Sequence, residues 1–161
     1  ATDPQGLALR LAQLLLKEKK DLELTVLTGH NAISAFQFEE LASQFKSLNL
    51  PGPISNMAKT LWEHDVVVCA GGVTLHEATA VGTPAFVINQ AEHQQSKARF
   101  VEKSGAAINL GMGNKYNTKK LREALSSEKL DLASMSLKGK KLIDGRGVFR
   151  VTAAITELIK K

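Results

Sequence analysis

Cysteine is nearly absent from this sequence of 161 residues. The single cysteine, Cys69, can form neither an internal disulfide nor a cysteine-based metal site. It stands inside an apolar run, which indicates a small core residue. Because disulfide frameworks belong to oxidising compartments, their absence leads us to expect a cytoplasmic protein.

Other signals are missing as well. No stretch is long and apolar enough to span a bilayer, and no signal peptide is recognisable. The four histidines fit no His-x-x-x-His or comparable spacing, so we expect neither a metal ion nor a cofactor. The sequence also contains no Walker loop, no Gly-x-Ser-x-Gly elbow and no Gly-x-Gly-x-x-Gly dinucleotide fingerprint.

The charge of the chain is mildly positive, at +5, and its apolar content of 43% is ordinary for a globular protein. The lysines are scattered or gathered near predicted helix ends, as at Lys17, Lys19 and Lys20, where they complement the helix dipole. We therefore expect no nucleic-acid partner. The charge is compatible with an anionic nucleotide or with peripheral association with a membrane.

The most informative stretch of the sequence covers residues 66–89. Two runs, 66–70 and 85–88, are apolar at every position, which is typical of parallel strands covered on both faces. Gly71-Gly72 predicts a sharp turn after the first run, and Gly82-Thr83-Pro84 predicts the end of a short helix before the second. Strand, glycine turn, helix and strand make a βαβ unit.

The start of the helix in this unit has two interpretations. Thr74 is followed three residues later by Glu77, the spacing of a capping box in which both side chains serve the helix itself. Alternatively, a phosphate lies on the amides of residues 72–74, and Glu77 accepts hydrogen bonds from sugar hydroxyls. The spacing alone leaves both interpretations open.

Helical and extended patterns alternate along the whole chain. We predict main strands near residues 21–27, 66–70, 85–88 and 106–110, with helices between them and a last helix over 148–159. This alternation predicts an α/β fold, a Rossmann-like parallel sheet with helices on both faces. Without repeats or linkers, residues 1–161 form a single predicted domain, and the start without methionine indicates a piece of a longer protein.

Polar residues follow several of the predicted strands, at the edge where doubly wound sheets bind ligands. Gly29 and His30 follow the first strand, and His93 and Gln94-Gln95 follow the third. Each histidine is alternatively an ordinary surface residue, and the glutamines are alternatively a polar helix start. Trp62, like Met57, is interpreted as a core residue rather than as a platform for a base.

Together these segments resemble the C-terminal half of GT-B nucleotide-sugar enzymes. The middle of the chain is similar to the donor-binding domain of the peptidoglycan N-acetylglucosaminyltransferases. The start is similar to a group that holds the spore-coat polysaccharide biosynthesis proteins and the UDP-sugar hydrolases of pseudaminic acid synthesis. The segments that carry the resemblance are residues 2–4, 56–68, 71–77, 82–84, 92–95 and 105–107.

The resemblance implies a binding role for several residues. Glu77 would bind the ribose hydroxyls of UDP, while the diphosphate would lie at the positive end of the helix. The other implied contacts are Gly71, Gly72, Thr74 and Leu75 with the diphosphate, Met57 and Ile54 with uracil, Gln94 and Gln95 with the donor sugar, and Gly29, His30 and His93 along the cleft.

The function implied is that of a UDP-sugar-binding domain of a glycosyltransferase of cell-surface polysaccharide biosynthesis. The family's N-terminal half, which carries the acceptor site and the general base or acid, is not in this sequence. That half is the expected partner, the catalytic residues are unknown, and this chain alone is expected to catalyse little. The alternatives are a UDP-sugar hydrolase domain, a non-catalytic nucleotide- or partner-binding module, and a phosphate-binding enzyme of another α/β family.

Overall fold

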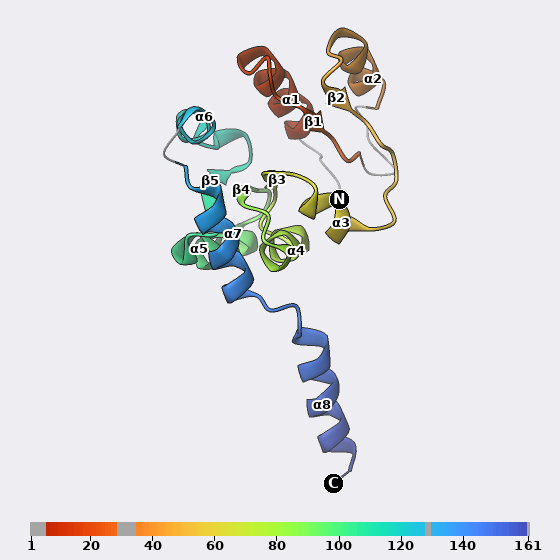
Figure 1. Cartoon of the computed structure of the whole chain (residues 1–161), viewed down its shortest axis with the longest axis vertical. Coiled ribbons are helices and arrows are strands. Elements are labelled where there is room, and N and C mark those ends of the chain that lie inside the picture. The colour runs from red at the N-terminus through yellow and green to blue at the C-terminus, as the bar shows by residue number, and fades with distance from the viewer. Residues whose placement is uncertain (1–5, 29–34, 128–129, 161) are drawn as a thin grey trace. The chain divides into compact units, whose positions relative to one another are not determined.

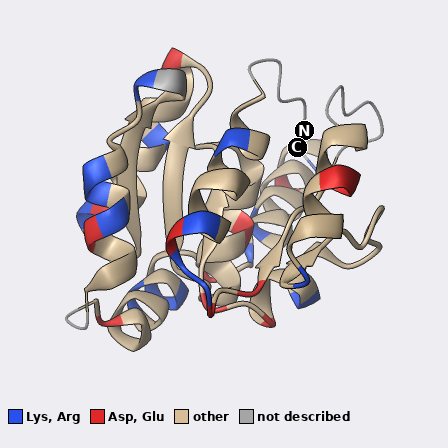
Figure 2. Ribbon diagram, turned by 90° about the horizontal axis from the view of Figure 1, so that it is seen from above, with Lys and Arg blue, Asp and Glu red and all other residues tan. Residues whose placement is uncertain are grey.

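The computed structural model describes residues 6–28, 35–127 and 130–160 (Figure 1). The contacts divide the chain into two units, residues 1–55 and 56–161. Gly29 and His30, and the proline-led helix start at residues 2–4, lie outside the described residues. Figure 2 shows basic and acidic residues spread over many elements rather than along one of them.

The first unit pairs two short parallel strands and packs helices against them. Leu24 is the register partner of Leu48. Only two residues of the expected strand over 21–27 form ladder pairs, so the alternating pattern overestimated its length. The apolar core gathers Ala12, Leu16, Phe38, Leu41 and Leu48. The elements are α1 (Leu7–Glu18), β1 (Leu24–Thr25), α2 (Ala35–Gln44) and β2 (Leu48–Asn49).

The second unit holds a three-stranded parallel sheet in the order β3-β4-β5. All described strand pairs of the chain are parallel, and this confirms the predicted α/β fold class. The elements are α3 (Met57–Trp62), β3 (Val67–Cys69), α4 (Val73–Val81), β4 (Ala85–Asn89), α5 (Glu92–Ser104), β5 (Ala107–Met112), the 3-10 turn η1 (Gly113–Lys115), α6 (Thr118–Ser126), α7 (Leu132–Leu142) and α8 (Gly147–Ile159).

The middle strand β4 is buried along its whole length, as its continuous apolar run predicts. Leu75 of α4 and Val101 of α5 pack with Val87 of β4 in one core cluster. The register between β4 and β5 shifts at one point, because Val87 pairs with Asn109 and Ile88 pairs with Gly111. Leu110 is the extra residue of this bulge, and it is only 2% exposed.

Helix α7 lies close to α4 because it carries a glycine at the contact. A Cβ on Gly139 would stand 2.9 Å from the backbone oxygen of Thr79. Any larger residue would push the two helices apart. This packing places the side chains of α7 beside the C-terminal end of α4.

Helix α8 follows a joint held by a short ion pair. The guanidinium of Arg150 donates to both carboxylate oxygens of Asp144, at 2.7 and 3.0 Å. That pair, with the Arg146 amide, holds the pKa of the Asp144 carboxyl well below its usual range. The expected apolar face of the last helix is present, but α8 buries none of its residues. Within the described residues, no helix has both the length and the apolar character needed to cross a membrane.

Candidate functional site

The candidate site lies where β3 ends and α4 begins. The amide of Gly72 donates to the oxygen of Ala70 at 2.8 Å, which closes a tight turn. Gly72 is the N-cap of α4, and the helix starts at Val73. The expectation that Thr74 caps this helix is therefore wrong, because Thr74 already lies inside the first turn.

Among the residues that the structure describes, none caps the amino end of α4. The N-cap Gly72 offers no side chain, and no other described side chain accepts a hydrogen bond from the first amides of the helix. Those amides carry the positive end of the helix dipole, and this combination suits an anion. The side chain of Val73 points into solvent, with 74% of the residue exposed, so the outer face of this turn is open.

The two glycines of the turn have different surroundings. A Cβ on Gly71 would collide with Oδ1 of Asn89 and stand 2.7 Å from the backbone oxygen of Gln94. A Cβ on Gly72 would meet nothing within 4 Å. Gly71 therefore lets the turn pack closely on the end of β4 and the start of α5, whereas Gly72 faces open space.

Asn89 is the residue of this site that the sequence analysis missed. It is fully buried, and its Nδ2 donates to Oδ1 of Asn109 and to the oxygen of Gly111, both at 3.1 Å. Its Oδ1 has no hydrogen-bond partner within residues 6–28, 35–127 and 130–160, and it faces Gly71. Asn89 thus ties the end of β4 to β5 and packs against the turn that follows β3. The available signal was an amide residue closing an otherwise apolar run.

Glu77 lies one helical turn after Thr74, on the same side of α4. It is partly buried and makes no hydrogen bond or ion pair with another described residue. Because Thr74 is not the N-cap, the capping-box interpretation of Glu77 fails, and its carboxylate is free for a ligand. The neighbouring His76 supports the turn instead, with Nδ1 3.1 Å from the oxygen of Gly72.

The start of α5 brings Gln94 next to the glycine turn. The Oε1 atom of Gln94 accepts a hydrogen bond from the amide of Gln90 at 2.7 Å. Gln95 donates from Nε2 to the carboxylate of Glu92. His93 is exposed on the same turn of the helix. Both glutamines are therefore held within the start of α5.

Three further residues, Leu75, Met57 and Ile54, were predicted to contact UDP. The side chain of Leu75 is buried in the core, so only its backbone amide can face a ligand. Met57 is partly buried at the start of α3, and Ile54 belongs to the first unit. In the part of the chain that the structure describes, no three His, Cys, Asp or Glu side chains gather in a metal-binding group.

Cys69 ends β3 just before the glycine turn. Removal of its thiol from water raises the pKa of Cys69 to about 12, so the thiol stays protonated at neutral pH. This supports its interpretation as a small packing residue rather than a nucleophile.

Several curated proteins are similar to this chain. The spore coat polysaccharide biosynthesis protein SpsG of Bacillus subtilis is 35% identical over 111 residues, which are 66% of this chain and 32% of that protein. The UDP-N-acetylglucosamine–N-acetylmuramyl-(pentapeptide) pyrophosphoryl-undecaprenol N-acetylglucosamine transferase of Listeria monocytogenes is 29% identical over 154 residues. That match covers 88% of this chain and 41% of the transferase, so the chain spans less than half the length of these relatives.

Both expected resemblances, to spore-coat and to peptidoglycan proteins, are thus confirmed. A transferase of the same name from Methylibium petroleiphilum is 32% identical over 114 residues. The family model described as the glycosyltransferase family 28 C-terminal domain matches residues 7–145, which is most of the sequence. The chain therefore belongs to the glycosyltransferase family 28 C-terminal domain family.

Proposed function

We propose that this chain is the donor-binding domain of a glycosyltransferase of cell-surface polysaccharide biosynthesis, and that it binds a UDP-sugar. The observation that carries the proposal is the uncapped amino end of α4 with the unpaired carboxylate of Glu77 one turn further on. The relatives named as transferases of UDP-N-acetylglucosamine support the choice of nucleotide. The N-terminal half of such an enzyme would supply the acceptor site.

The chemistry follows from the arrangement of the charges. The diphosphate would accept hydrogen bonds from the first amides of α4, and the ribose hydroxyls would donate to Glu77. When the bond to the sugar breaks, negative charge grows on the leaving UDP. The same amides and the helix dipole would stabilise that charge in the transition state.

The donor sugar would lie toward the start of α5. Gln94 and Gln95 are bonded there to the Gln90 amide and to Glu92, and those bonds would exchange for bonds to sugar hydroxyls. The roles proposed for Met57 and Ile54 with uracil, and for Gly29, His30 and His93 along the cleft, remain predictions. So does the expectation of a cytoplasmic protein.

Calorimetry with UDP tests the proposal directly. Glu77→Ala should weaken UDP binding by about 1–3 kcal/mol, through the loss of charge-assisted hydrogen bonds. Glu157→Ala is the matched control, because Glu157 lies exposed on α8. An unchanged UDP affinity in Glu77→Ala, or an equal loss in both variants, would contradict the assignment of Glu77.

A thermal-shift panel tests the ligand class. UDP should raise the melting temperature of the chain more than CMP, GDP, NAD or inorganic phosphate at equal concentration. Equal stabilisation by all of these anions would instead favour a general anion-binding module. Stronger stabilisation by phosphate than by UDP would favour a phosphate-binding enzyme of another family.

A further inference from the structure

Trp62 is the only tryptophan of the chain, and it is 69% exposed. Its neighbour Leu61 is only 4% exposed, so α3 turns Leu61 inward and Trp62 outward. The expectation that Trp62 belongs to the core is wrong. Tryptophan joins a large apolar ring to a polar N–H group, and this combination makes it common at binding interfaces.

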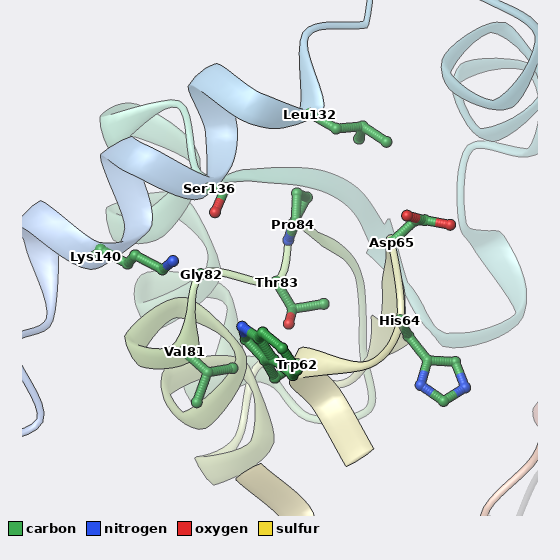
Figure 3. A pocket seen from close by; sticks show the side chains of 10 residues that line it. All are labelled: Trp62, His64, Asp65, Val81, Gly82, Thr83, Pro84, Leu132, Ser136 and Lys140. Atoms are coloured by element: carbon green, nitrogen blue, oxygen red, sulfur yellow. The ribbon is translucent and has the colours of Figure 1, made fainter. Parts of the chain in front are cut away.

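A cavity of about 210 Å³ lies beside Trp62 (Figure 3). Asp65 lines it just before β3, Pro84 lines it just before β4, and Lys140 reaches it from α7. These residues stand at the amino ends of the strands, whereas the glycine turn stands at the carboxyl ends. The cavity is therefore separate from the proposed UDP site, and all of it belongs to the second unit.

The floor of the cavity is built rigidly. The hydroxyl of Thr83 donates to the oxygen of Leu61 at 2.7 Å, which ties the segment before β4 to α3. A Cβ on Gly82 would collide with Cε of Lys140 and stand 2.7 Å from Oγ of Ser136. The absence of a side chain at Gly82 thus leaves room for the Lys140 stem to pass over the glycine.

The polar groups of the cavity carry one charge of each sign. Figure 3 shows Lys140 and Asp65 on opposite sides of the segment from Gly82 to Pro84. Neither makes an ion pair or a hydrogen bond with another described residue. His64, by contrast, holds the oxygen of Thr60 with its Nδ1 at 2.7 Å. A simple anion or cation would suit one end of the cavity and oppose the other.

A neutral ring with many hydroxyl groups suits both ends. Its hydroxyls can donate to a carboxylate and accept from an ammonium, and its C–H face can lie on an indole. The volume fits one small ring, since sites for drug-sized ligands enclose roughly 300–1,000 Å³. We propose that this cavity binds one neutral pyranose unit of a carbohydrate, with its ring against Trp62 and its hydroxyls shared between Asp65 and Lys140.

The single tryptophan makes the proposal directly measurable. Titration of the chain with methyl β-D-glucopyranoside should change the emission of Trp62 and saturate, with a Kd of about 1–10 mM. The titration is run with and without saturating UDP, and glycerol at equal mass concentration controls for bulk solvent effects. Saturation that UDP leaves unchanged is the expected result.

Two conservative variants locate the binding. Lys140→Met keeps the stem over Gly82 but removes the ammonium, and it should weaken binding about tenfold. Lys141→Met, the next residue of α7 and no part of the cavity, should leave Kd unchanged within about twofold. Asp65→Asn preserves shape, should weaken binding about fivefold, and serves if the first variant does not fold.

Each contrary result overturns the proposal. An emission that does not saturate by about 50 mM, or that follows glycerol, shows that the cavity binds no pyranose. Loss of the response in the presence of UDP places the sugar in the donor site instead. Equal Kd values for Lys140→Met and Lys141→Met, or an unchanged Kd for Asp65→Asn, show that the cavity is not the site. None of these outcomes depends on Glu77, so this test can fail while the proposed UDP site stands.

Discussion

Helix α4 begins and ends at glycines that serve opposite purposes. At its amino end, no described side chain caps the helix, and a Cβ on Gly72 would meet no described atom within 4 Å. At its carboxyl end, Gly82 adopts a φ of 86° and its amide donates to the oxygen of Ala78 at 2.9 Å. One end is open to a ligand, and the other is closed by the protein itself.

The difference comes from the neighbours rather than from the glycines. Lys140 and Ser136 of α7 cover Gly82, while no described side chain covers Gly72. A glycine in a sequence therefore predicts where the backbone turns. It does not predict whether protein or ligand fills the space beside it. Substitutions at Gly71, Gly72 and Gly82, the three glycines that flank this helix, separate the two cases.

Gly71→Ala should have the largest effect. The new methyl group would press on the buried Asn89 and on the backbone oxygen of Gln94, and neither can move without disturbing β4 or α5. We expect a loss of about 2–3 kcal/mol in the free energy of unfolding, as for other overpacked sites. Urea denaturation followed by circular dichroism measures it. A loss below about 1 kcal/mol would show that the turn is loosely packed.

Gly82→Ala should cost less, about 1–2 kcal/mol. An alanine at a φ of 86° is strained, but the side chain of Lys140 can swing away from the methyl group. The same urea titration measures this change. If Gly82→Ala destabilises the chain more than Gly71→Ala, the carboxyl end of α4 is the more tightly packed of the two.

Gly72→Ala should barely change stability, by less than about 0.5 kcal/mol, because its φ of −102° is allowed and its surroundings are open. The methyl group would instead stand where the diphosphate is proposed to lie, so UDP affinity should fall about tenfold. Calorimetry with UDP measures this. Full affinity in this variant would place the diphosphate elsewhere.

The last prediction concerns the effect of pH, through the thiol of Cys69 next to the open end of the helix. Its pKa of about 12 exceeds the ordinary value of 9.0, so the unfolded chain loses this proton first. Stability should therefore fall as pH rises from about 9 toward 12, and at pH 8 the folded thiol should react slowly with Ellman's reagent. Urea should restore a fast reaction. A fast reaction of Cys69 with Ellman's reagent in the native chain would show that the structure around the amino end of α4 opens readily.

The βαβ unit could be predicted from the sequence because its signals are local. Two continuous apolar runs and the glycine turn between them identify β3, α4 and β4, and the structure places all three within a residue or two of the prediction. The capping of α4 by Thr74 could not be settled, since that depends on where the first helical turn closes. Thr74 and Glu77 are three residues apart whether the helix begins after Thr74 or already at Val73, so their spacing cannot tell these two cases apart.

Other features depend on contacts between distant segments. Trp62 and Leu61 are both apolar neighbours on one short helix, and only the packing of α3 against the rest of its unit decides which is buried. Asn89 gains its role from Asn109 and Gly71, which are each about twenty residues away in sequence. The amphipathic pattern of α8 predicts an apolar face, but it does not predict which part of the protein covers that face, and α8 buries none of its residues.

The bulge at Leu110 has a consequence for how this chain can change over generations. Paired residues of neighbouring strands share a surface, so a strand without Leu110 could keep Gly111 opposite Ile88 and Met112 opposite Asn89, and it would lose only the buried Leu110 side chain. A deletion elsewhere in β5 would instead move the residues beyond it to the other surface of the sheet. Insertions and deletions should accumulate in the connections around the sheet and spare residues 107–112.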